Sequence, residues 1–257
     1  MLCENTLENL SFLETVQKIS NQHLMSYYLY PDLLTRCWIR GNMISSLDGS
    51  STKDGRSGGL ANINDRAIFS IIRQSADIII VGASTVLIEE YSNVCLSINQ
   101  QNERKKYGQS NIPQIAVITT SSKLKKSDKF FSLNKKQVPF VFTSANNFIN
   151  TQKRLNMSAE VVNVSSKNPE KIDFFTIVKF LAERKFFRIL IEGGPFILGK
   201  LMEKNILNEL CLTISPILIG GKSKRIAIST KQLEVRMQPL SLLMDNEGYF
   251  YIRYIRT

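Results

Sequence analysis

The sequence predicts an α/β protein with a central, mostly parallel sheet, helices on both faces and an antiparallel C-terminal hairpin. Two observations support this fold class. Short apolar runs alternate with stretches of helical periodicity through the middle of the chain, and a β-rich tail follows them. With 257 residues, the chain is long enough for one large domain or two small ones.

The first part of the chain contains periodic leucines, a turn-rich loop and a fully apolar run. Ile68, Ile71 and Ile72 stand at helical spacing after Asn62 and Asn64, either of which can cap a helix. The run DIIIVG is typical of a strand buried on both faces. We expect, in chain order, one or two helices over 4–35, a strand over 37–45, a polar loop, a helix over 63–75, a strand over 77–82, a helix over 84–90 and a long polar loop over 91–113.

Strands and helices alternate in the second part of the chain. Asn168, Pro169 and Glu170 form a helix-start pattern, and basic residues collect at the end of the same stretch. The turn DNEG separates the last two strands. We expect buried strands over 114–120, 138–144 and 160–165, a helix over 168–185, a strand over 186–192, a helix over 195–205, a strand over 210–220 and short strands between 232 and 255.

Two glycine turns, VGAST (81–85) and IEGGP (191–195), join an apolar strand to a helix start. Ligands of such sheets bind outside the carboxyl ends of the strands, where glycine lets backbone N–H groups approach an anion. A tight connection with Pro195 at the first helical position explains the second turn equally well. Neither turn is a known nucleotide fingerprint, but two of them in one sheet favour a phosphate-rich cofactor.

Composition excludes several classes of protein. The four cysteines are far apart and form no C-x-x-C pair, which fits a reduced, cytoplasmic protein. The single histidine, His23, lies near the N-terminus, which argues against a histidine-based triad or a multi-histidine metal site. We see no apolar run long enough to cross a membrane and no secretory signal.

The formal net charge is +11, and lysines gather in KLKKSDKFFSLNKK, residues 123–136. This stretch could contact nucleic acid through phosphates, but it lacks arginine and any recognisable binding motif. A solvated loop explains it better. A positive field of this kind can also attract small phosphorylated ligands.

Three blocks of sequence resemble the reductase domain of riboflavin biosynthesis, the pyrimidine reductase family with the dihydrofolate reductase-like fold. They are NMISSLDGSSTKDGRSGGL, IIRQSADIIIVGASTVLIEE and LIEGGPFILGKLMEKNILNELCLTISPILIGG, and they stand in family order. The resemblance covers residues 36–257 and leaves residues 1–35 as an N-terminal helical extension.

The resemblance implies a reaction and its partners. Family enzymes reduce 5-amino-6-(5-phosphoribosylamino)uracil with NADPH and open the ribose to a ribityl chain. Bifunctional relatives carry a zinc deaminase whose H-x-E and P-C-x-x-C elements are missing here, so the resemblance implies a reductase only, with no metal. Family analogy also suggests a homodimer that takes a phosphorylated pyrimidine.

The resemblance implies a catalytic Glu192, which faces the substrate, with Asn42, Ser57 and Arg73 as further substrate residues. Arg73 could equally be a surface helix residue, and Asp48 is better explained as a turn former. The ends of two strands, Thr119–Ser121 and Thr143–Ser144, are candidates for the adenosine 2′-phosphate or simply loop starts. The cofactor residues implied are Gly82, Ala83, Thr85, Glu89, Gly193, Gly194, Pro195, Phe196, Ile197, Leu198 and Gly199.

The chain departs from the family pattern at several of these positions. Many bacterial members have lysine in place of Asn42 and arginine in place of Leu96, and members usually have aspartate for Glu89 and proline for Tyr91. Other cations must then hold a substrate phosphate. The nearest in sequence are Arg56, Arg73 and residues 104–106, and we expect Arg73 and Arg56 first because arginine forms the better fork.

Two other function classes stay open. One is a different NADPH-dependent reductase of the same fold, which acts on a pterin-like compound or another C=N or C=O group. The other is a nucleic-acid-binding protein that uses the basic stretch. Tight NADPH binding without affinity for nucleic acid would remove the second, and substrate turnover decides the first.

Overall fold

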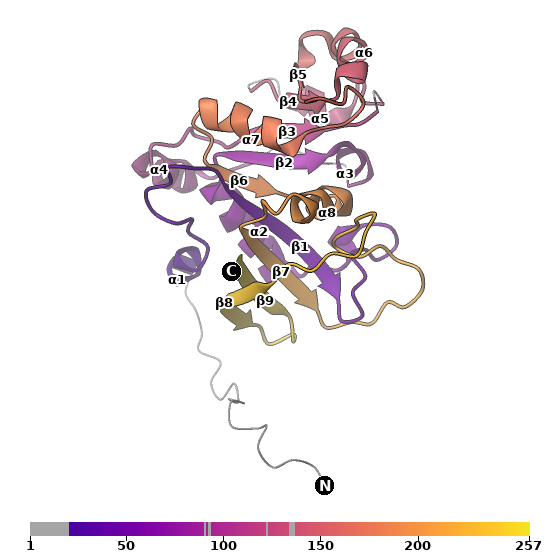
Figure 1. The fold of residues 1–257 in the computed structure, drawn as a ribbon. Helices are drawn as coiled ribbons and strands as arrows, with labels where there is room; N and C mark the ends of the chain where they lie inside the picture. Colours follow the sequence, from indigo (N-terminus) through magenta and orange to yellow (C-terminus); the bar gives the residue numbers. More distant parts are fainter. Residues whose placement is uncertain (1–20, 90, 92–93, 122, 134–136) are drawn as a thin grey trace.

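The computed structural model describes residues 21–89, 91, 94–121, 123–133 and 137–257 (Figure 1). A nine-stranded sheet in the order β5-β4-β3-β2-β6-β1-β7-β9-β8 forms its centre. The strands from β5 to β7 are parallel, and β9 and β8 add to the β7 edge as an antiparallel hairpin. The predicted fold class is therefore confirmed.

The strands are β1 (Trp38–Ser46), β2 (Ile78–Gly82), β3 (Gln114–Ile118), β4 (Phe140–Thr143), β5 (Glu160–Asn163), β6 (Arg188–Ile191), β7 (Glu209–Ser215), β8 (Met237–Met244) and β9 (Phe250–Arg256). The helices are α1 (Asn21–Ser26), α2 (Ile63–Ser75), α3 (Ala83–Ile88), α4 (Ile98–Lys106), α5 (Lys129–Leu133), α6 (Ala145–Leu155), α7 (Phe174–Glu183) and α8 (Pro195–Glu203), with short 3₁₀ turns at Ser57–Gly59 and Asn156–Ser158.

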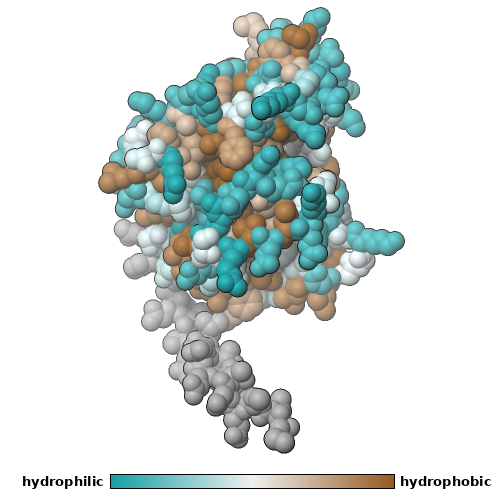
Figure 2. Space-filling model, in the orientation of Figure 1, coloured by the Kyte–Doolittle hydropathy of each residue, from teal (hydrophilic) through white to brown (hydrophobic). Residues whose placement is uncertain are grey.

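Hydrophobic cores lie on both faces of the sheet. On one face, residues of α2, α5 and α6 pack against Ile79 and Val81 of β2. On the other face, residues of α7 and α8 pack against Ile78 and Ile80 of the same strand. The alternation of side chains along a strand explains why this run is apolar at every position. Figure 2 shows hydrophobic residues scattered among hydrophilic ones on the surface.

The expectation of a long polar loop over 91–113 is wrong, because helix α4 occupies the centre of this stretch. The helix is polar and shows no apolar stripe, so periodicity did not reveal it. Its start is nevertheless encoded. The Ser97 side chain accepts from the Gln100 N–H, and the Gln100 side chain accepts from the Ser97 N–H, which is a capping box.

Two element boundaries also differ from prediction. Helix α7 begins at Phe174 rather than near Asn168, because Asp173 accepts from the Phe175 N–H and caps it, whereas the Asn168 side chain closes a local turn at Glu170. Strand β7 ends at Ser215 instead of continuing to residue 220. Pro216 lacks an N–H for the ladder, and Gly220 lies in the left-handed region with φ of +71°.

Three further expectations need correction. Residues 27–35 are not helical, and residues 1–20 of that expected extension lie outside the described residues. The lysine-rich stretch includes α5, whose Phe130 and Phe131 are buried, so it is not only a solvated loop. Strand β5 is the edge of the sheet and is half-exposed rather than buried. No described helix is long and apolar enough to cross a membrane.

Candidate active site

The two glycine turns meet at the carboxyl ends of adjacent strands. Strand β2 pairs with β6, and beyond this pairing the Gly82 N–H donates to the Gly193 carbonyl at 2.9 Å. Gly193 has φ of +95°, a region that favours glycine. A Cβ on Gly194 would lie 3.2 Å from Thr85 Oγ1, and one on Gly82 would lie 3.2 Å from the Gly194 nitrogen. The two turns thus form one backbone surface in which added side chains would be crowded.

The residues after Gly194 are not equivalent. Ile197 and Leu198 are buried in the core, and Gly199 lies under the segment that follows β7. A Cβ on Gly199 would sit 1.9 Å from the Ile228 carbonyl oxygen, so this glycine is needed for packing. Phe196, by contrast, is 59% exposed at the start of α8, with the Lys224 ammonium 5.9 Å from its ring centroid.

Glu192 and Arg73, both predicted at the substrate, form an ion pair. Arg73 Nε and Nη2 each donate to the Glu192 carboxylate at 2.7 Å, and the Tyr91 hydroxyl donates to the same carboxylate. Burial acts to lower the pKa of Arg73, but the charge of Glu192 raises it, and the pKa lies above its ordinary value. Burial and Glu192 raise the pKa of Tyr91 well above its usual range, so its hydroxyl stays a donor.

Ser57 and Glu89, assigned by resemblance to substrate and cofactor, contact each other. The Ser57 N–H donates to Glu89 Oε1 at 2.8 Å, which holds the loop after β1 against the end of α3. Asp48 in the same loop is a turn former, as predicted. It accepts from Ser46 and from the Ile219 and Gly220 N–H groups, and the Ser46 hydroxyl with these N–H groups lowers its pKa to about 2.

Asn42 lies beside this cluster. Gly41 pairs with Ile191, so the next residues of the two parallel strands, Asn42 and Glu192, are neighbours on the same face of the sheet. Asn42 is half-buried. Leu96, which stands where many relatives have arginine, is buried in the core, so it offers nothing to a phosphate.

Arg104 cannot replace the missing cations. Its side chain is buried, and Nη1 donates to the Gln74 and Ala76 carbonyls at 2.6 Å, where it satisfies the end of α2. Ala76 stands two residues before the first residue of β2, so Arg104 lies at the amino end of that strand, away from the glycine turns. Arg104, one of the candidates named from sequence after Arg73 and Arg56, is therefore not placed to hold a phosphate beside the glycine turns.

The candidates for the adenosine 2′-phosphate differ in access. Thr119, Thr143 and Ser144 are buried at the ends of β3 and β4, whereas Ser121 is exposed. The Thr119 hydroxyl donates to the Ser121 carbonyl and shapes the turn. Of these four residues, only Ser121 is open to a ligand in the described structure.

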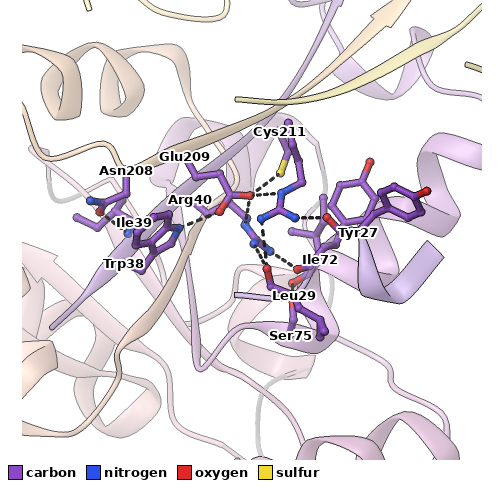
Figure 3. A network of polar contacts seen from close by, with 12 residues as sticks. Tyr27, Leu29, Trp38, Ile39, Arg40, Ile72, Ser75, Asn208, Glu209 and Cys211 are labelled. Atoms are coloured by element: carbon purple, nitrogen blue, oxygen red, sulfur yellow. Dashed lines mark hydrogen bonds and ion pairs between the residues drawn. The ribbon is translucent and has the colours of Figure 1, made fainter. Parts of the chain in front are cut away.

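Sequence reasoning missed a second polar cluster, at the amino ends of β1 and β7 (Figure 3). Glu209 contacts Arg40 Nε at 2.9 Å and Arg253 Nε at 2.6 Å, and it accepts from Trp38 Nε1 at 2.8 Å. Both guanidinium groups also donate to carbonyls of residues 27–29. The available signal was that Arg40 is the one charged residue of β1 and Glu209 the one charged residue of β7.

This cluster explains why the chain leaves the helical conformation after residue 26. The carbonyls of residues 27–29 accept hydrogen bonds from Arg40 and Arg253 of the sheet instead of from the N–H groups of a following helical turn. Burial acts to raise the pKa of Glu209, but Arg40 and Arg253 hold it below the ordinary value. Among the described residues, no group of three or more His, Cys, Asp or Glu side chains could hold a metal ion.

A mixed sheet with two joined glycine turns at the carboxyl ends of central strands places this chain among the α/β proteins, a class whose ligands typically bind at that edge. Residues 37–251 match the family model described as the RibD C-terminal domain, and the chain belongs to this family. The match includes both glycine turns, Arg73 and Tyr91.

Named relatives support the same grouping. The chain is 28% identical over 196 residues to the riboflavin biosynthesis protein RibD of Buchnera aphidicola, across 73% of this chain and 50% of that protein. It therefore spans about half the length of that relative. It is 24% identical over 188 residues to the 2,5-diamino-6-ribosylamino-4(3H)-pyrimidinone 5′-phosphate reductase of Archaeoglobus fulgidus, across 73% of this chain and 84% of that protein.

A solved structure extends the likeness to the fold. The crystal structure of a pyrimidine reductase-like protein from Corynebacterium diphtheriae superimposes with a TM-score of 0.80 at 27% identity. The superposition covers 93% of this chain and 99% of the other. The fold described above is thus shared along nearly its whole length with this relative.

Proposed function

We propose that this protein is an NADPH-dependent reductase of riboflavin biosynthesis that reduces 5-amino-6-(5-phosphoribosylamino)uracil to its ribitylamino product. Membership of the RibD C-terminal domain family supports this, as does a relative in Buchnera aphidicola named 5-amino-6-(5-phosphoribosylamino)uracil reductase. The observation that carries the proposal is the joined pair of glycine turns beside the Glu192–Arg73 pair.

A second substrate is favoured by one relative. The match to the archaeal reductase covers 84% of that reductase, which is named for 2,5-diamino-6-ribosylamino-4(3H)-pyrimidinone 5′-phosphate. That compound carries an amino group where the uracil compound carries a carbonyl oxygen. Both compounds therefore belong in the test.

The residues of the glycine turns fit a pyrophosphate. Backbone takes the place of side chains at Gly82, Gly193 and Gly194, where a Cβ would meet neighbours within 4 Å. Helix α8 begins at Pro195, whose missing N–H needs no partner there, and its N-terminus adds partial positive charge. We assign Ala83, Thr85 and Phe196 to the same site, with Glu89 holding the neighbouring loop at Ser57.

Ile197, Leu198 and Gly199 contribute to the cofactor site through their backbone or through packing. The side chains of Ile197 and Leu198 are buried, and a Cβ on Gly199 would clash with Ile228. When bound, NADPH would supply a hydride to the C=N carbon of the ring-opened substrate, and a proton from solvent would go to the nitrogen. The task of the protein's own residues would be to bind and orient the two reactants, which can contribute several orders of magnitude in rate without histidine chemistry.

We also propose a homodimer in the cytoplasm, by analogy with the family. The basic net charge of +11 suits phosphorylated small molecules as partners.

The test is purified protein with NADPH and each of the two pyrimidine phosphates, followed through the absorbance of the reduced nicotinamide. We expect turnover of at least one compound and no affinity for nucleic acid. NADPH binding without turnover of either compound would favour the other reductases of this fold. Nucleic-acid binding without NADPH binding would overturn the proposal.

A further inference from the structure

A pocket opens at the amino end of the sheet, at the opposite end from the glycine turns. It has a volume of about 40 Å³, and three segments line it: the chain after α1, the end of α2 and the end of α4. The exposed residues Leu29, Asp32 and Tyr107 are part of the lining, so the pocket is open to the surface. A volume of this size holds a few water-sized groups, which suits a small ligand or the end of a larger one.

Two buried polar atoms in the lining have no partner. The Nη2 group of Arg104 and the hydroxyl of Tyr30 make no hydrogen bond among the described residues, and these two residues are only 1% and 6% exposed. Polar groups at this depth are normally satisfied by the protein, by ordered water or by a ligand. Arg104 and Tyr30 therefore need a partner that the rest of the described chain does not supply.

The charge of Arg104 is also without a counter-charge. Its Nε and Nη1 donate to three backbone carbonyls, and no carboxylate in the described part of the chain pairs with it. By contrast, Arg40 and Arg73 each pair with a glutamate, at 2.9 and 2.7 Å. Burial lowers the pKa of Arg104 to about 10, although the charge of Asp77 acts to raise it. The guanidinium thus stays charged at neutral pH.

The other charged groups around the pocket do not cancel this charge. Asp77 already accepts three hydrogen bonds from other groups, and it lies 3.6 Å from Arg188, which also lines the pocket. Glu103 pairs with Lys106 at 2.5 Å, and Asp32 is exposed at the surface. The inner wall is therefore left with one positive charge in excess.

We propose that this pocket is a second binding site and that it takes a small organic carboxylate. One carboxylate oxygen accepts from Arg104 Nη2 and the other accepts from the Tyr30 hydroxyl. The apolar part of the ligand lies against Met25, Leu29 and Ile71. This proposal does not depend on the proposed reaction, because the pocket and the glycine turns lie at different ends of the sheet.

A carboxylate fits this wall better than a phosphate or an uncharged group. A phosphate carries more oxygens than the two unused donors can satisfy, whereas an amide leaves the charge of Arg104 without a counter-charge. Burial raises the pKa of Tyr30, so its hydroxyl keeps its proton and donates to an anion.

The first experiment titrates the full chain with butyrate, butyramide and inorganic phosphate, and follows the backbone amides by NMR. Butyramide has the shape of butyrate without its charge. We expect butyrate to bind about 10-fold or more tightly than the other two, with shifts at residues 29–32 and 104–109. Equal affinity for butyrate and butyramide, tighter binding of phosphate, or no binding of butyrate would each overturn the proposal.

A competition with NADPH separates this site from the glycine turns. The affinity for butyrate should be the same with and without saturating NADPH, because the two sites do not overlap. Displacement of butyrate by NADPH would place butyrate at the glycine turns and would overturn the proposal.

The second experiment uses Tyr30→Phe, which removes only the hydroxyl and keeps the ring that lies 3.9 Å from Arg40 Cζ. We expect about 3- to 10-fold weaker binding of butyrate. The Tm should not fall, because the hydroxyl that is lost has no partner in the protein. A lower Tm would show that the hydroxyl is structural, and an unchanged affinity would place it outside the site. Either result would overturn the proposal.

Tyr28→Phe is the matched control. Tyr28 is 2% exposed, lies two residues away and is not part of the lining. This variant should bind butyrate with wild-type affinity. A loss equal to that of Tyr30→Phe would mean that removal of any buried hydroxyl in this segment weakens binding, which would also overturn the proposal.

The third experiment uses Arg104→Met, which removes the charge. We expect this variant to bind butyrate no more tightly than butyramide, and a retained preference for butyrate would overturn the proposal. Because Arg104 also binds the carbonyls at the end of α2, circular dichroism must first show that the variant is folded. If it does not fold, the ligand series on the wild type and on Tyr30→Phe still decides between a carboxylate site and none.

Discussion

Two arginine–glutamate clusters lie at opposite ends of the same sheet. At the amino ends of β1 and β7, the side chains of Arg40 and Glu209 are both 0% exposed. At the carboxyl end of β6, Glu192 is 2% exposed but its partner Arg73 is 16% exposed. The same chemical groups therefore form a closed cluster at one end and a cluster with one open side at the other.

The difference teaches where function can lie in such a sheet. In the amino-end cluster, the arginines use their remaining N–H groups on carbonyls of residues 27–29. These bonds hold residues 27–29 on the sheet. At the carboxyl end, the Arg73 side chain stays partly open to solvent, next to the glycine turns. The two clusters contain the same residue types, so the difference in burial, rather than residue type, indicates which cluster is structural and which one a ligand can reach.

The largest effect should come from the closed cluster. Glu209→Gln keeps the shape but leaves two buried arginines without a carboxylate, so we expect the free energy of unfolding to fall by about 3–5 kcal/mol. Urea unfolding measures this. NADPH affinity of the folded variant should not change, because the cluster lies at the far end of the sheet.

Glu160→Gln is the control for that variant, because the Glu160–Arg184 pair is largely exposed and 3.6 Å apart. We expect it to cost less than about 1 kcal/mol. If Glu209→Gln cost no more than this control, burial would not be what distinguishes the clusters.

The carboxyl-end cluster should show the reverse balance between stability and activity. Glu192→Gln retains an oxygen for Arg73 or Tyr91 but places an amide against a guanidinium, so we expect a loss of about 1–2 kcal/mol, smaller than at Glu209. Turnover should fall about 10-fold or more, because the arginine loses its orientation. Steady-state kinetics and thermal unfolding measure both. Normal turnover with a large loss of stability would make this cluster structural like the other.

The glycine turns give a third, smaller test. Gly194→Val adds a branched side chain whose Cβ lies 3.2 Å from Thr85 Oγ1, where backbone should approach phosphate. We expect NADPH affinity to fall about 10-fold or more while the protein stays folded. A titration of cofactor fluorescence measures it. Gly58→Val is the control, because a Cβ at Gly58 has open space around it. Equal cofactor affinity in both variants would place the cofactor elsewhere.

Most of the fold could be predicted because burial on both faces leaves a strong pattern. Helix α2 and strand β2 were predicted with at most one residue of error, since isoleucines at helical spacing after the Asn62 cap mark the helix and an unbroken apolar run marks the strand. Helix α4 was missed because its contacts are polar, and β7 was extended because the apolar run continues past Pro216. Hydrophobic periodicity indicates which positions are buried, but it does not indicate polar contacts.

The position of the candidate site in the fold could be predicted, but the contacts between its side chains could not. The glycine turns and Glu192 were found from sequence, since each marks the carboxyl end of an apolar strand. That Arg73 binds Glu192, or that Ser57 binds Glu89, depends on residues 119 and 32 positions apart. A single sequence does not report such contacts. The amino-end cluster was invisible for the same reason.

The smallest effect should come from a polar cluster that is half open to solvent. Asp245, in the turn between β8 and β9, accepts from Asn62 at 2.7 Å and from the Tyr251 hydroxyl at 2.6 Å, and so ties the hairpin to the start of α2. Burial acts to raise the pKa of Asp245, but these donors, together with Asn64, lower it to about 2. The ionised form is therefore favoured in the folded protein.

The sign of the pH effect follows from linkage. A carboxyl whose pKa is lower in the folded state adds stability above its ordinary pKa, and that stability is lost as pH falls from about 4 to about 2. Because Asp245 is largely solvated, we expect only about 1 kcal/mol. Asp245→Asn should lose this at neutral pH and should converge with the wild type near pH 2. Urea unfolding across that pH range measures it, with Asn246→Ala as the control within the same turn. A difference between Asp245→Asn and the wild type that does not shrink with acid would show that packing, rather than charge, sets the role of Asp245.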